Sequence, residues 1–492
     1  MRTILLIAAV CLSLCFASVA GASDDVWVLG GFVSTDNRMT IEPGEYSKFV
    51  FNENTLGLKV KAFPVPSVSL TGSVEFVTLG TDERLTVEQQ QDRTQVEPYE
   101  IRIDEAFIHT SNFVIDNLDI KVGKQRIQWG TGDQFNPTDN LNPDNFHDPL
   151  DFGEKLATVS AQAVYYAGPV TLTAVFLPMA RPSLLPVTDA RPIFEKMFEK
   201  LVPEFDIDTG NSDVDAIFDS LMVGAIQNAK IDDISIYYEQ VEPRASNMSG
   251  AFKVATNLGP IDMSMSYAYV WDDFGVPKRI NIYVDPLSSG TTVLIDKVDV
   301  EVHNAFYRMH VIGADFAASI PVLEIGMWGE GAYFIPEPFD TEYFLDLEEG
   351  VNFIISEYSG EDFYDGVVIA KDHPLDDHYF KYVVGVDYTF PGAWYINAQF
   401  VRGLPNDNTA ELIDHYAFAG IDKPFLNDTI KPRIFAGMDF EDESWILYPQ
   451  IFFYPNDSME ITIGTFHVFG EVDTKLGAFG DDIVFGKMKV SF

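Results

Sequence analysis

Cysteine is nearly absent from this chain: its 492 residues include only Cys11 and Cys15, both within the first 22 residues. If that segment is removed, no disulfide can form, which argues against a small secreted domain held together by disulfides. Basic residues are also scarce, with 32 Lys and Arg against 75 Asp and Glu and a formal net charge of -43. Because such a chain is repelled by phosphate backbones, the charge excludes a nucleic-acid-binding role.

Long apolar runs are missing beyond residue 22, where none approaches the ~18 residues that a membrane-spanning helix needs. The sequence therefore excludes a helical membrane protein. The first 22 residues follow a different pattern: Met1-Arg2-Thr3 is basic, residues 4–16 are apolar and residues 17–22 are mostly small. This three-part pattern predicts a signal peptide over residues 1–22, with cleavage after Ala22.

Catalytic motifs are missing as well. The chain has no Gly-x-Ser-x-Gly, no His-Glu-x-x-His and no phosphate-binding glycine loop, and its eight histidines are scattered. We therefore expect no enzyme and no cofactor. A hydrolase whose residues are brought together only by the fold stays a lesser alternative.

Alternation of apolar and polar residues is the main feature that the chain does have. It is clear over residues 56–63, 68–76, 261–271 and 380–390. A period of two residues is typical of a β-strand with one apolar face, and segments of about ten residues match a tilted transmembrane strand. A secreted β-sandwich or β-helix is the alternative, but sandwich strands are shorter and have polar outer faces.

The connections between these segments are of two kinds. Tight turns are expected at Pro64-Val65-Pro66, Ser111-Asn112, Gly168-Pro169, Gly259-Pro260, Ile320-Pro321, Pro391-Gly392, Asn427-Asp428 and Pro455-Asn456-Asp457. Long loops are expected at 36–52, 80–99, 127–156, 179–247, 272–302, 335–378, 404–411, 441–444 and 470–482. The predicted fold is all-β: a transmembrane antiparallel β-barrel of about 18 strands (16–18) over residues 23–492.

Two segments carry a resemblance to a known class of proteins. Val484, Gly486, Met488, Val490 and Phe492 share one face of the last strand, and the chain stops on an aromatic residue. This resembles the terminal signal of Gram-negative outer-membrane proteins, in which a final Phe is read by the barrel-assembly machinery. Residues 122–139 also resemble a strand-to-loop element of porin-like barrels from little-characterised families. The resemblance implies a pore-forming protein of the bacterial outer membrane, in contact with lipid and lipopolysaccharide, with Phe492 as assembly signal.

A barrel of this strand number leaves a water-filled channel unless a loop plugs it, so we expect passive or substrate-preferring diffusion of small solutes. An adhesin or structural barrel is the alternative. The alternation predicts the following pore-lining residues: Lys59, Lys61, Glu75, Glu324, Glu330, Asp387, Asp439, Lys487 and Lys489. The four lysines would form a basic ladder opposite the acids, although all nine residues could equally be merely solvated.

The long loops carry further hypotheses. Loop 127–156 is the candidate constriction, with Asp133, Asp139, Asp144 and Asp148; a plain surface loop is the alternative, although Trp129 and Phe135 favour burial. Loop 179–247 is predicted to contain two short helices, and between them Asp206, Asp208 and Asp213 form either a weak calcium site or a flexible acidic turn. Loop 335–378 is strongly acidic and could bridge to lipopolysaccharide through divalent cations, but a solvated, self-repelling surface explains its composition as well. The sequence leaves the oligomeric state and the solute open.

Overall fold

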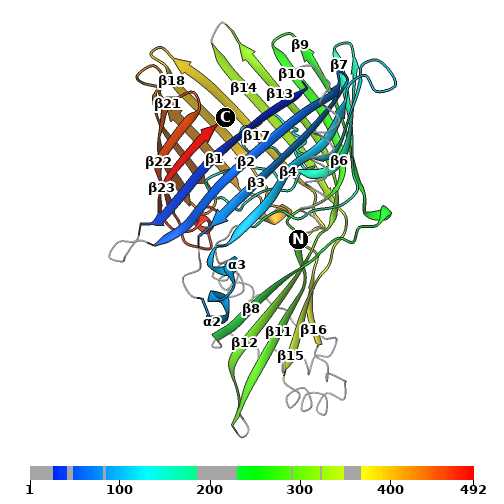
Figure 1. The fold of residues 1–492 in the computed structure, drawn as a ribbon. Coiled ribbons are helices and arrows are strands. Elements are labelled where there is room, and N and C mark those ends of the chain that lie inside the picture. Colours follow the sequence, from blue (N-terminus) through cyan, green and yellow to red (C-terminus); the bar gives the residue numbers. More distant parts are fainter. Residues whose placement is uncertain are drawn as a thin grey trace.

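Eighteen antiparallel strands close into a barrel (Figure 1). The structure is a computed structural model that describes residues 26–41, 48–80, 85–185, 230–289, 292–321, 324–347 and 367–492. The barrel strands are β1 (Trp27–Thr40), β2 (Phe49–Val65), β3 (Val68–Leu79), β4 (Tyr99–Thr110), β5 (Leu118–Gln125), β6 (Thr158–Ala167), β7 (Val170–Leu177), β9 (Ser249–Leu258), β10 (Ile261–Trp271), β13 (Arg308–Ile320), β14 (Ile325–Pro336), β17 (Tyr379–Phe390), β18 (Trp394–Arg402), β19 (His415–Asp422), β20 (Ile430–Asp439), β21 (Trp445–Asn456), β22 (Met459–Phe469) and β23 (Ile483–Ser491). The predicted strand number and all eight tight turns are confirmed.

Pairing of the first strand with the last closes the barrel. The register between β1 and β23 runs from Phe32 opposite Ser491 to Thr40 opposite Ile483. Phe492 extends this pairing, because its backbone N–H donates to the Gly31 carbonyl at 2.9 Å and its carbonyl accepts from the Gly31 N–H at 3.0 Å. Since no barrel strand is left at an edge, every backbone group of the wall has a neighbour to bond.

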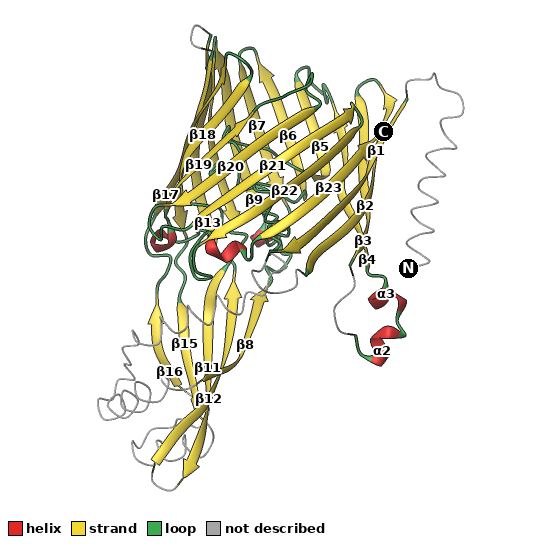
Figure 2. Cartoon of the chain, turned by 90° about the vertical axis from the view of Figure 1, so that its left-hand side faces the viewer, coloured by secondary structure: helices red, strands yellow, loops and turns green. Residues whose placement is uncertain are grey.

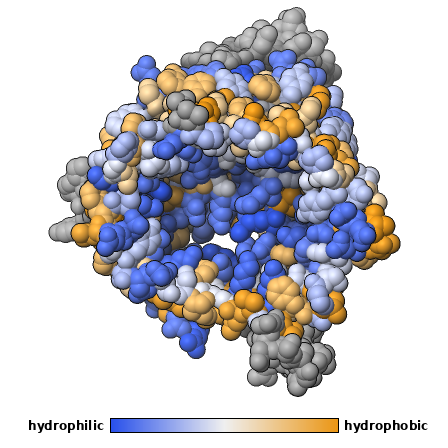
Figure 3. Space-filling view, turned by 90° about the horizontal axis from the view of Figure 1, so that it is seen from above, coloured by the Kyte–Doolittle hydropathy of each residue, from blue (hydrophilic) through white to orange (hydrophobic). Residues whose placement is uncertain are grey.

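The outer face of the wall is apolar and exposed. In β10, Met263, Met265 and Tyr267 are 36%, 67% and 44% exposed, whereas Ser264 and Ala268 on the opposite face are buried. The alternation seen in the sequence therefore separates an outward apolar face from an inward polar one. Figure 3 looks into the barrel from the end with the short turns, and hydrophilic residues line the interior around a narrow open gap.

Helices are few and short in the described part of the chain. Between β3 and β4 lie α2 (Val87–Gln90) and α3 (Arg93–Val96), which Thr86 and Asp92 cap. None of the described helices has the length and apolarity that crossing a membrane requires.

A second sheet corrects the prediction of plain loops at 272–302 and 335–378. It has the order β16 (Val367–Asp372), β15 (Thr341–Leu347), β11 (Val276–Ser289), β12 (Thr292–Ala305) and β8 (Lys230–Glu239), and it extends from the long-loop end of the barrel (Figures 1 and 2). The β11–β12 hairpin has an apolar face with Ile282 and Val300 fully or almost fully buried. Its two flanking pairings are parallel and join segments far apart in the sequence, which no local pattern reveals.

Candidate functional site

The connection between β5 and β6, residues 126–157, folds into the barrel and is here called the inner loop. Four of its apolar side chains, Trp129, Phe135, Leu141 and Leu150, are 4–7% exposed and join the two clusters of buried residues. Phe135 stacks on Phe418 of β19 at 4.7 Å between ring centroids. An outward loop would expose these groups to water, so their burial stabilises the inward position.

Glu330 of β14 holds the first half of the inner loop. Its carboxylate accepts the backbone N–H groups of Thr131 at 2.8 Å, Gly132 at 3.0 Å and Thr138 at 2.7 Å, and the Thr138 hydroxyl at 2.7 Å. Gly130 makes this approach possible, because its φ is +86° and a Cβ there would lie 2.3 Å from Glu330 Oε2. One buried carboxylate thus satisfies three backbone donors that would otherwise be unpaired.

Asp133 fastens the tip of the inner loop to β18. Its Oδ2 accepts from Asn397 Nδ2 at 3.0 Å, and its backbone carbonyl accepts from Gln399 Nε2 at 2.9 Å. The loop therefore leaves the wall after β5, contacts β14 and reaches β18. In the order of neighbouring strands, β18 lies four strands beyond β10.

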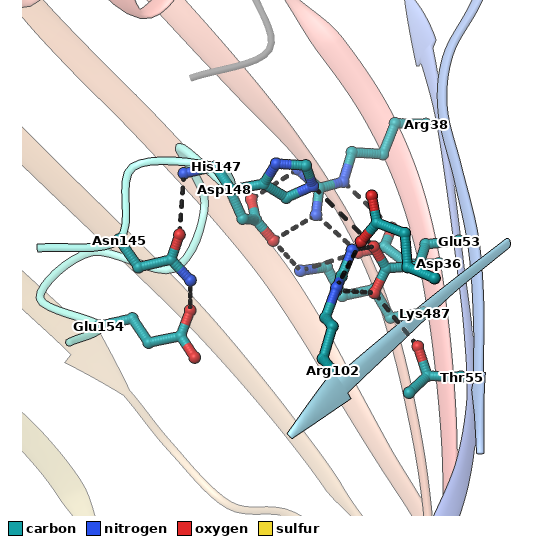
Figure 4. Close-up of polar contacts among 11 residues, drawn as sticks. Asp36, Arg38, Glu53, Thr55, Arg102, Asn145, His147, Asp148, Glu154 and Lys487 are labelled. Carbon is teal, nitrogen blue, oxygen red and sulfur yellow. Dashed lines mark hydrogen bonds and ion pairs between the residues drawn. The ribbon is translucent and has the colours of Figure 1, made fainter. Parts of the chain in front are cut away.

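Asp148 fastens the second half of the loop to β1 and β23 (Figure 4). Arg38 Nη1 donates to Asp148 Oδ1 at 2.6 Å, Arg38 Nη2 donates to Oδ2, and Lys487 Nζ lies 3.4 Å from Oδ2. Burial alone would raise the pKa of Asp148, but the Arg38 hydrogen bonds and the charges of Lys487 and Arg38 lower it to about 2. Asp148 is therefore ionised at any physiological pH and works as a permanent anchor.

Asp139 and Asp144 lie deeper and have a different electrostatic character. Lys155 Nζ donates to Asp144 Oδ2 at 2.8 Å and to the Asp139 backbone carbonyl at 3.2 Å. Burial raises the pKa of Asp139 to about 6 and, together with the nearby Asp273, raises that of Asp144 to about 7, against the lowering effect of Lys155. These two groups therefore change charge near neutral pH, unlike Asp148.

All four acids of the predicted constriction thus lie on the inner loop, inside the barrel. The structure does not test whether the loop limits conductance, and that role stays a prediction. The four predicted ladder lysines lie on β2 and β23, which both neighbour β1.

The surroundings of the four ladder lysines differ. Lys59 is 59% exposed along its side chain and lies 3.5 Å from Glu105, whereas Lys487 lies 3.1 Å from Asp36. Lys61 and Lys489 lie over the rings of Phe63 and Phe32. The lysines are thus divided between charged and aromatic partners.

The predicted acidic residues are placed less uniformly. Glu75 lies opposite Arg102 of β4, and Asp387 lies close to Gly326 of β14. Glu324 lies in the turn before β14, with a φ of +55°, rather than on a strand face. Asp439 ends β20 and accepts the Glu441 N–H at 2.8 Å, and its fully buried side chain closes a turn instead of facing water.

Sequence reasoning missed the basic residues that hold the inner loop. Arg38 falls within the long loop predicted at 36–52, yet β1 continues to Thr40. Residues 35–40 are Thr-Asp-Asn-Arg-Met-Thr, with Met39 as the only apolar residue, so no alternation in the sequence marks this end of β1. Arg126, which donates to Asp104 at 2.6 Å, likewise lies at the start of the inner loop.

Several predictions fall outside the described residues: the signal peptide, the two helices of loop 179–247, and the calcium candidates Asp206, Asp208 and Asp213. Within the described ranges, no group of three or more His, Cys, Asp or Glu residues could hold a metal ion.

Comparisons with known proteins give a likeness of fold. No family model matches the chain, and no curated protein matches it. Among solved structures, OccAB1 of Acinetobacter baumannii is 7% identical, covers 96% of this chain and 98% of its own, and gives a TM-score of 0.48. OccK9 (OpdG) of Pseudomonas aeruginosa is 8% identical over 95% of this chain and 98% of its own, with a TM-score of 0.46. OmpF of Salmonella typhi, solved with daunomycin, is 8% identical over 95% and 97%, with a TM-score of 0.38. At these values the likenesses do not identify a function, and the fold rests on the strand pairing itself.

Proposed function

We propose that this protein is a bacterial outer-membrane channel through which small polar solutes diffuse, with the inner loop as its constriction. One observation carries the proposal: a closed 18-stranded barrel has an apolar outer face and a hydrophilic interior around an open gap (Figure 3). A barrel of this strand number is too wide for its own side chains to fill. Its outer face needs lipid, and closed barrels of this kind belong to outer membranes.

The charges support a channel that orients its solutes. Asp133 lies at the tip of the inner loop, where it is held by β18, and the exposed Lys59 lies on β2. Fixed charges of opposite sign around a narrow aqueous passage act on a dipolar solute more strongly than in bulk water. We expect preference among polar solutes rather than a purely size-limited pore.

Liposome swelling and planar-bilayer recording test the proposal. The refolded protein should give discrete conductance steps and should let small sugars and amino acids pass. Replacing residues 133–150 by a short Gly-Ser linker should increase the conductance, because that segment lies inside the barrel. The absence of both ion current and swelling would instead favour an adhesin, a structural barrel or a barrel hydrolase.

A further inference from the structure

Three basic side chains, here called the rim cations, lie on the outward face of the barrel at the end from which the second sheet extends (Figure 2). They are Lys124 near the end of β5, Arg308 at the start of β13 and Arg402 at the end of β18. Lys124 shares its strand face with Val122, which is 48% exposed, and Arg402 shares its face with Phe400, which is 38% exposed. Because the long connections of outer-membrane barrels face the exterior, the proposed location puts the rim cations at the outer leaflet.

Within the described residues, none of the rim cations forms an ion pair with a carboxylate. Lys124 Nζ donates to the Ile103 carbonyl, and Arg402 Nη1 donates to the Phe380 carbonyl. A backbone carbonyl satisfies an N–H group but leaves the positive charge in place. The chain has 75 acidic residues for 32 basic ones, so the lack of acidic partners at this rim does not result from a shortage of acids.

Arg308 has an aromatic setting. Its guanidinium carbon lies 4.1 Å from the Tyr269 ring centroid and 5.1 Å from that of Trp271, its register partner on the outward face of β10. Nη1 donates to the Ser246 carbonyl at 2.9 Å, and Nη2 donates to the Met248 carbonyl. The two rings and the two carbonyls orient the guanidinium at the lipid boundary without neutralising it.

Two acids at the same end of the barrel are engaged elsewhere. Glu337, which follows β14, accepts the Tyr269 hydroxyl at 2.5 Å. Glu441, which follows β20, accepts the His415 backbone N–H at 2.8 Å and lies 2.6 Å from His415 Nδ1. A cation beside lipid is costly without a counter-ion, so the rim cations favour an anion supplied from outside the chain.

We propose that the rim cations bind the phosphate groups of lipid A, the phosphorylated glycolipid anchor of lipopolysaccharide, in the outer leaflet. Phosphate oxygens accept charge-assisted hydrogen bonds from Lys and Arg, and the apolar wall beside the rim contacts the acyl chains. In the order of neighbouring strands, β13 lies five strands beyond β5, and β18 lies three beyond β13. At ~4.8 Å per strand the rim cations are about 24 and 14 Å apart or more, so each binds a separate lipid. The inference rests on the proposed outer-membrane location and not on the passage of solutes.

Native mass spectrometry of the detergent-solubilised full chain tests the rim sites, with diphosphoryl lipid A as probe. Lipid A stripped of both phosphates has the same acyl chains and should bind much more weakly. Each of Lys124→Gln, Arg308→Gln and Arg402→Gln should weaken binding at its own site about fivefold, because one basic residue at a charged membrane surface contributes ~1 kcal/mol. Arg308→Lys and Arg402→Lys keep the charge and should keep most of the affinity, and heat-modifiable gel mobility checks that each variant is folded.

The opposite rim supplies a matched control. Lys423 follows β19 there, and its Nζ lies 4.8 Å from the Trp394 ring centroid and 5.0 Å from that of Phe425. It has the charge of a rim cation and an aromatic setting like that of Arg308, but it lies at the end with the short turns. Lys423→Gln should therefore leave the binding of lipid A unchanged.

Several results would overturn the proposal. They are equal binding of the stripped lipid, unchanged affinity when all three rim cations are replaced by Gln, and an equal loss in Lys423→Gln. A loss in the Lys variants as large as that in the Gln variants would show a structural role instead of a charge. Equal affinity for phosphatidylglycerol would overturn the glycolipid as the partner. Ion current without lipid A binding would defeat the rim sites alone, whereas lipid A binding without current would support them and defeat the channel function.

Discussion

Removing the charge of Asp148 should release the second half of the inner loop. In Asp148→Asn, the guanidinium of Arg38, which is 2% exposed, loses a bidentate partner and keeps only Asp36 at 2.6 Å. Breaking a buried ion pair costs about 3–5 kcal/mol, and the remaining Asp36 contact places this case at about 3 kcal/mol.

A second route gives a similar magnitude. The Asp148 side chain is 19% exposed, and its pKa lies at about 2 instead of 3.8. At about 1.4 kcal/mol for each pKa unit, this corresponds to roughly 2.5 kcal/mol of stabilisation. The sign is that of a depressed carboxylate: the stabilisation is complete above pH 4 and is lost as the pH falls through about 2. A loss of about 2–3 kcal/mol shifts the equilibrium between pinned and released loop by roughly 30-fold to 160-fold.

The assay is single-channel recording together with limited proteolysis of the loop. The variant should show larger and noisier conductance and faster cleavage within residues 133–150. Asp151→Asn is the matched control, because it removes the same charge from the same loop at an exposed position three residues away. If both variants behave alike, the effect is one of charge and not of anchoring. If Asp148→Asn matches the wild type in conductance and cleavage, the anchoring argument is wrong.

Three further predictions concern the same interior. Burial raises the pKa values of Asp139 and Asp144 to about 6 and 7, so the folded chain binds their protons more tightly than the unfolded chain. The stability that proton binding contributes is therefore lost as the pH rises through 6–7. The loop should be cleaved more slowly at pH 5 than at pH 8, and equal rates would contradict this. Glu330→Ala leaves three backbone donors unpaired and should destabilise the pinned loop by about 3–5 kcal/mol, raising conductance, while Glu330→Gln should be milder. Lys59→Glu with Lys61→Glu should shift the reversal potential in a salt gradient toward cation selectivity; unchanged selectivity would remove these lysines from the account of the pore.

The wall of the barrel was predictable from local patterns. Each strand alternates because one face meets lipid and the other water, and each tight turn has its own Gly, Pro or Asn signal. These signals are contained within about ten residues. Strand direction, the strand number to within two and the end of the barrel that carries the long loops follow from them without any knowledge of distant contacts.

The second sheet was not predictable, because its flanking pairings join β11 to β15 and β12 to β8 in parallel across long sequence separations. The alternation of Ile280 and Ile282 was visible, but it does not say which segment lies beside it. The same limit applies to Glu330, which reads as one more inward carboxylate until the backbone of the inner loop is placed against it.

The sequence by itself therefore determined the closed wall, its polar interior and the candidate loop, since each follows from residue periodicity and composition. Only the tertiary structure decided which charges meet. Asp148 and Asp139 are both aspartates on one loop, yet Arg38 from β1 lowers the pKa of the first, whereas burial raises that of the second. Their charge states differ because the cost of burying a charge depends on the partners that the fold brings to it.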